Sequence, residues 1–183
     1  MPRAPLGLAA ALLAATSAHA VAQPQTYILE HWSRYLEACG PLLQDPDAGI
    51  RAALDNFPTS HLRASADGSV KYIDWFDGQD DDKSGSVELH MNGATASIAC
   101  DVNAVDGRFS LDALETTFKS LVGANPSLEL TGGRILDQSD TQSEDEAVFV
   151  VTNVFPGFTV LTTVHLTGDF IAFFYATELS VSP

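Results

Sequence analysis

Residues 87–102 read Val-Glu-Leu-His-Met-Asn-Gly-Ala-Thr-Ala-Ser-Ile-Ala-Cys-Asp-Val, and this stretch decides the fold class. Apolar and polar residues alternate on both sides of Asn92-Gly93, which is the period of a half-buried strand. An Asn-Gly pair between two alternating segments is a strong signal for a two-residue hairpin turn. The stretch therefore predicts two antiparallel strands that share one apolar face. On the second strand this face carries Ala94, Ala96, Ile98, Cys100 and Val102.

Helical periodicity precedes this hairpin and returns after it. Apolar residues of the segment 26–39 recur at helical spacing, and Gly40-Pro41 is expected to end that helix. Asp45-Pro46 supplies the N-cap and the first-turn proline of a second helix, which is expected to end before Pro58. A third helix is expected after Ser110, because an apolar stripe follows it at Leu111, Leu114, Phe118, Leu121 and Val122.

Further strands are predicted by runs rich in β-branched and aromatic residues. These runs are 70–76, 128–136, 147–155, 158–166 and 170–179. Gly132-Gly133 predicts a bulge within the second of them. Together the elements indicate an α+β fold, with the helices packed on one face of an antiparallel sheet.

The run that begins at Phe170 is apolar on both of its faces. Phe170, Ala172, Phe174 and Ala176 lie on one face, and Ile171, Phe173 and Tyr175 lie on the other. An antiparallel strand usually exposes one face to water. We therefore expect the second face to be covered as well, either by another part of the chain or by a partner.

The segments 23–105 and 106–183 share a layout, in which helix is followed by short antiparallel strands. His90-Met91-Asn92-Gly93 in the first half resembles His165-Leu166-Thr167-Gly168 in the second. Two tandem helix-plus-meander units within one compact domain would explain the likeness, and chance reuse of hairpin residues is the alternative. The layout is similar to that of secreted enzyme inhibitors such as the β-lactamase inhibitor proteins. No motif is shared with them, and this chain has two cysteines where each of their modules carries a disulfide.

Residues 1–22 have the features of a cleaved signal peptide. Arg3 precedes an apolar run from Leu6 to Ala15, and Ala18-His19-Ala20 and Ala20-Val21-Ala22 are both cleavage patterns. The apolar run is too short to span a bilayer, and no other segment of the chain is long enough. We expect export to a bacterial periplasm or to the medium. In such an oxidising compartment Cys39 and Cys100 are expected to form a disulfide, with a reactive thiol as the alternative.

The composition limits the partners that the chain can have. Its 183 residues include 9 basic and 24 acidic ones, which gives a formal net charge of −15. Nucleic acid and anionic membrane surfaces repel such a protein. We therefore expect neither as a partner, and favour a basic protein.

One acidic segment has part of the spacing of a calcium-binding loop. Numbered in this way, Asp80, Asp82, Ser84, Ser86 and Glu88 would be the ligands, and Gly85 would allow the sharp turn. Met91 stands where such a loop needs a bidentate glutamate. A weak calcium site is therefore one interpretation, and a solvated hairpin loop is the other.

No pattern in the chain points to a catalytic residue or to an organic cofactor. Nucleophile elbows, Walker loops and dinucleotide-binding glycine patterns are absent, and no two of the histidines have zinc-ligand spacing. A second acidic run offers charge for binding a basic partner, at Asp137, Asp140, Glu144, Asp145 and Glu146. We therefore expect a non-catalytic binding protein, either an inhibitor or an accessory subunit. A calcium-stabilised secreted module and a carboxylate-dependent hydrolase are the alternatives.

Overall fold

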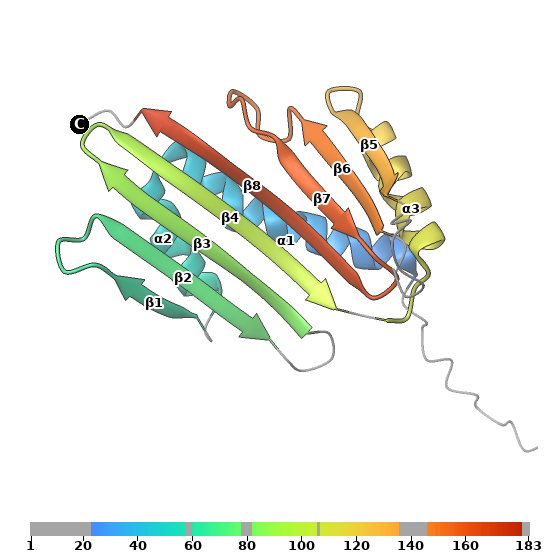
Figure 1. Cartoon of the computed structure of the whole chain (residues 1–183), viewed down its shortest axis with the longest axis horizontal. Coiled ribbons are helices and arrows are strands. Elements are labelled where there is room, and N and C mark those ends of the chain that lie inside the picture. Colours follow the sequence, from blue (N-terminus) through green and yellow to red (C-terminus); the bar gives the residue numbers. More distant parts are fainter. Residues whose placement is uncertain (1–22, 58–59, 78–81, 106, 136–145, 181–183) are drawn as a thin grey trace, which may run out of the picture.

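The computed structural model describes residues 23–57, 60–77, 82–105, 107–135 and 146–180 (Figure 1). Within them the chain forms helices α1 (Pro24–Gln44), α2 (Pro46–Asn56) and α3 (Leu111–Gly123), and strands β1 (His61–Ala64), β2 (Val70–Asp77), β3 (Asp82–Asn92), β4 (Thr95–Val105), β5 (Glu129–Ile135), β6 (Glu146–Thr152), β7 (Thr162–Leu166) and β8 (Phe170–Ser180). All pairings between these strands are antiparallel, and they build one sheet in the order β1-β2-β3-β4-β8-β7-β6-β5. The predicted α+β class is confirmed.

The sheet is covered by helices on one face. Figure 1 shows α1, α2 and α3 behind the sheet, with its other face turned toward the viewer. Burial along β4 alternates accordingly: Ala96, Ile98, Cys100, Val102 and Ala104 are buried on the helix side, and the intervening residues are exposed or half-buried. The apolar core therefore lies between the helices and a single face of the sheet.

The order of elements repeats along the chain. Helix precedes a four-strand meander in both parts, and the last strands of the two meanders, β4 and β8, pair at the centre of the sheet. Both strands have 11 residues, and each residue of β8 stands 75 positions after its counterpart in β4. Cys100 pairs with Tyr175 at the midpoint. The two meanders are thus related by an approximate two-fold axis through this residue pair.

The N-caps that the sequence predicts are present. The Asp45 carboxylate accepts from the Ala48 N–H at 2.9 Å, and the Ser110 hydroxyl accepts from the Ala113 N–H at 3.3 Å. Each bond satisfies a donor that the first helical turn would leave unpaired. The second and third helices thus begin where the sequence predicts.

The predicted end of the first helix at Gly40-Pro41 is wrong. α1 continues through Pro41 to Gln44, and Leu42 and Leu43 are buried in its last turn. Proline removes one backbone hydrogen bond within a helix. Burial of two leucine side chains stabilises the extra turn by about 3–6 kcal/mol, which offsets that loss.

Three details of the strands also differ from expectation. The hairpin turn is Gly93-Ala94, because Asn92 pairs with Thr95; Gly93 has a positive φ of 61°. The predicted bulge at Gly132-Gly133 is wrong, since both residues pair in an unbroken ladder with β6. The run 158–166 forms a strand only from Thr162. Strand β1 was not predicted at all, because its four residues are all exposed and show no alternation of buried and exposed positions.

Candidate functional site

We call the side of the sheet turned away from the helices the open face. Strand pairing places residues of neighbouring strands side by side on it, because directly opposite residues point to the same side. Ser86 of β3 is opposite Asp101 of β4, and Asp101 is opposite Phe174 of β8. The centre of the open face consists of Ser84, Ser86, Asp101, Asn103, Ala172 and Phe174.

Large apolar side chains are exposed on this face. Phe174 is 40% exposed, Val105 is 43% exposed and Phe76 is 57% exposed. The apolar side chains of β4 that point toward the helices are all nearly inaccessible. The expected cover over the second face of β8 is therefore not supplied by any helix or strand among the described residues.

Asp101 is the most unusual ionisable group of the open face. The Ser86 hydroxyl donates to Asp101 Oδ1, and Asn103 Nδ2 donates to Oδ2 at 2.5 Å. Burial raises the pKa of the Asp101 carboxyl above its usual value, and these two hydrogen bonds and a weaker one from the Ser86 backbone N–H oppose the rise. In the described part of the chain no cation pairs with this carboxylate, and both side-chain donors are neutral.

The other carboxylates near the centre of the face have basic partners. Arg63 Nη2 donates to Asp74 Oδ2 at 2.9 Å, and its guanidinium lies 5.0 Å from the centre of the Tyr72 ring. His90 Nε2 lies 2.6 Å from Glu88 Oε1. Asp101 thus differs from Asp74 and Glu88, since it is half-buried without a basic neighbour.

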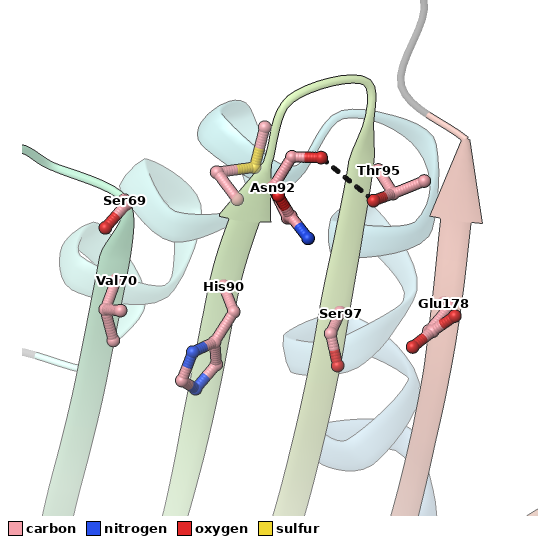
Figure 2. Close-up of a pocket in the computed structure, with 8 residues that line it drawn as sticks. Ser69, Val70, His90, Asn92, Thr95, Ser97 and Glu178 are labelled. Carbon is pink, nitrogen blue, oxygen red and sulfur yellow. Dashed lines mark hydrogen bonds between the residues drawn. The ribbon is translucent and has the colours of Figure 1, made fainter.

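A shallow hollow of about 490 Å³ lies at one end of the open face. Figure 2 shows His90, Ser97 and Glu178 side by side on β3, β4 and β8 within it. His90 and Ser97 are directly opposite, but no hydrogen bond joins them in the described structure, and His90 bonds to Glu88 instead. The carboxylate-dependent hydrolase alternative requires two facing carboxylates, and the residues that line this hollow include one, Glu178.

The predicted pair of cysteines forms a disulfide. The Cys39 and Cys100 sulfurs are 2.00 Å apart, and the bond links α1 to the middle of β4. Both residues are buried, so the reactive-thiol alternative does not apply. The disulfide indicates an oxidising, exported compartment.

The predicted calcium ligands fall partly outside the described residues. Asp80 is outside them, as is the side chain of Asp82. Ser84, Ser86 and Glu88 lie in β3, which pairs with a strand on each side, so same-face neighbours are about 7 Å apart. A calcium ion needs every ligand oxygen within about 2.6 Å of the ion itself. The described residues contain no group of three or more His, Cys, Asp or Glu side chains that could hold a metal.

The second acidic run is mostly outside the described residues too, since these end at Ile135 and resume at Glu146. Glu146 begins β6, and its Oε1 lies 2.6 Å from His165 Nδ1. His165 and His90 occupy equivalent positions near the end of the third strand of each meander. His90 lies two residues before the end of β3, and His165 lies one residue before the end of β7. Each is hydrogen-bonded to a glutamate, so the two ends of the open face carry similar His–Glu pairs.

The pairing of Asp101 with Phe174 was not predicted from the sequence. Buried residues alternate with exposed or half-buried ones along β4, so Asp101 and Cys100 point to different sides of the sheet. The sequence alone predicts this orientation. The sequence does not predict that Phe174 is the neighbour of Asp101, because Phe174 comes from a strand of the other meander.

Comparison with protein-family models, with curated proteins and with solved structures finds no match. Within the described ranges no helix combines the length and the apolar character needed to cross a membrane. Function must therefore be argued from the open face itself.

Proposed function

We propose that this exported protein acts by binding a basic protein partner on its open face, as an inhibitor or an accessory subunit, and that it performs no catalysis. The observation that carries the proposal is the exposure of Phe174 beside Asp101, and of Val105 farther along β4, on a face that the described helices leave uncovered (Figure 1). Protein interfaces typically combine exposed aromatic anchors with polar groups in this way.

The charge of the chain supports a basic partner. A formal net charge of −15 attracts cationic proteins over several ångströms and accelerates their encounter. The acidic run from Asp137 to Glu146 adds to this field. Location in the bacterial periplasm or medium, with residues 1–22 as the signal peptide, is part of the same proposal.

The proposal is tested by capture of a partner. The exported, oxidised protein is immobilised, exposed at low ionic strength to the extracytoplasmic fraction of the producing cells, and eluted with salt. We expect basic proteins to be enriched over an empty matrix, because screening by salt weakens charge-mediated association.

Two matched variants make the capture specific. Phe174→Ser removes an exposed aromatic from the open face, whereas Leu29→Ser removes an equally exposed residue from α1, on the helix side. We expect Phe174→Ser to abolish the enrichment and Leu29→Ser to leave it intact. Equal capture by both variants, or no protein enriched by the original chain, would contradict the proposal.

A further inference from the structure

The centre of the open face has a carboxylate and an aromatic ring in adjacent positions on paired strands. Asp101 and Phe174 are directly opposite in the β4–β8 ladder, which places their Cβ atoms about 4.5–5.5 Å apart. The carboxylate is held in place by Ser86 and Asn103, and the ring is 40% exposed. A flat cation can contact both groups at once.

The Asp101 carboxylate has capacity for such a ligand. An ionised carboxylate accepts about four hydrogen bonds; the side chains of Ser86 and Asn103 supply two, and the Ser86 backbone N–H adds a weaker interaction. Burial removes part of the water around the carboxylate, and no positively charged side chain among the described residues replaces that water. The raised pKa of Asp101 reflects this loss of hydration. A cation from outside would replace the hydration that burial has removed.

Among the basic side chains, arginine fits this pair best. Its planar guanidinium donates two parallel hydrogen bonds to a carboxylate and also stacks on aromatic rings. Lysine is a compact, strongly hydrated charge and does neither as well. The chain itself shows such an arrangement where Arg63 bonds to Asp74 and lies over the Tyr72 ring.

We propose that the partner inserts an arginine between Asp101 and Phe174, with its guanidinium bonded to the carboxylate and stacked on the ring. This inference rests on the proposed function and specifies which residues of the open face contact the partner. A second copy of this chain is a poor occupant, because two chains of net charge −15 repel each other.

The test uses three synthetic hexapeptides that alternate leucine with arginine, lysine or citrulline. Citrulline has nearly the shape of arginine but no charge, so it isolates the contribution of the cation. Each peptide is titrated into the isotopically labelled, oxidised protein, and amide shifts are followed by NMR. We expect the arginine peptide to perturb Asp101, Asn103 and Phe174 first, and to bind about tenfold more tightly than the citrulline peptide. The lysine peptide should fall between the two.

Matched variants locate the contact. Asp101→Asn and Phe174→Ala are each expected to weaken the arginine peptide by about tenfold. Glu178→Gln removes the same charge from the same face but lies four residues from Phe174 along β8, about 13 Å away. That exceeds the Debye length of about 8 Å at physiological ionic strength, so we expect little effect on binding.

The possible results separate this inference from the function on which it rests. Tight binding that maps to another surface, or that Asp101→Asn leaves unchanged, overturns the arginine site while a basic partner stands. Equal binding of the arginine and citrulline peptides overturns the charge argument. If no cationic peptide binds, or if the protein is a dimer that covers Phe174, both the inference and the proposed function fail.

Discussion

The Tyr175 hydroxyl donates a 2.9 Å hydrogen bond to the carbonyl oxygen of Cys39. Tyr175 is also paired with Cys100 across the β4–β8 ladder, and Cys100 is bonded to Cys39. One tyrosine of the second meander therefore contacts both ends of the disulfide, whose cysteines belong to the first half of the chain. Burial raises the pKa of Tyr175, so the hydroxyl stays protonated and can donate at all physiological pH values.

Removal of this hydroxyl should weaken the junction between the halves. We expect Tyr175→Phe to lower the free energy of unfolding by about 1 kcal/mol, which is the usual net value of one intramolecular hydrogen bond. Urea unfolding measures it. Tyr72→Phe removes a tyrosine hydroxyl from the open face and serves as the control. An equal loss of stability in both variants would show that the hydrogen bond to Cys39 stabilises the fold no more than the Tyr72 hydroxyl does.

The disulfide should contribute more to the free energy of unfolding than the Tyr175 hydrogen bond does. It closes a loop of 61 residues, for which chain entropy predicts a stabilisation of about 4 kcal/mol. We expect the double variant Cys39→Ala/Cys100→Ala to unfold at a correspondingly lower urea concentration. Reduced original protein is the control, and it should lose a similar amount. A double variant as stable as the oxidised protein would contradict the entropic argument.

Two adjacent glycines in β5 should respond differently to alanine. Gly132 has a φ of 101°, and an added Cβ would lie 2.3 Å from the Val148 carbonyl oxygen; around Gly133 nothing lies within 4 Å of such an atom. We expect Gly132→Ala to cost about 1–3 kcal/mol of stability, because the backbone must move. Gly133→Ala should change stability by less than about 0.5 kcal/mol. Thermal unfolding of the two variants decides this, and the reverse ranking would contradict the geometry.

Asp101 should make stability depend on pH. Its pKa in the folded state is raised by burial, so the folded chain holds this proton more tightly than the unfolded chain does. The stabilisation is therefore present at acid pH and is lost as the pH rises through the folded pKa. We expect the unfolding free energy of the original protein, relative to Asp101→Asn, to fall as the pH rises from about 4 through the folded pKa.

Urea unfolding across that range measures the difference, with Glu178→Gln as a matched carboxylate variant on the same face. A relative stability that rises with pH would contradict the sign of the shift.

Calcium should have little effect on the folded chain. Ser84, Ser86 and Glu88 lie in a row along a paired strand, and the Ser86 hydroxyl donates to Asp101. We expect the melting temperature to be the same with about 5 mM calcium and with chelator. A rise in melting temperature that Asp80→Ala abolishes would instead establish the calcium site that the sequence suggests.

Most of the local structure and one long-range bond follow from the order of the amino acids. Alternation in 87–102, the caps at Asp45 and Ser110 and the two cysteines predict the strands, the helix starts and the disulfide, because each depends on residues close in sequence or on the only available pairing. Long-range packing sets where α1 ends, since burial of Leu42 and Leu43 outweighs the effect of the proline before them. It also decided the candidate site. Asp101 acquires its neighbour Phe174 only when β4 and β8 pair, because the packing of the two meanders, and no local pattern, sets that register. Its pKa is raised because folding buries the carboxyl.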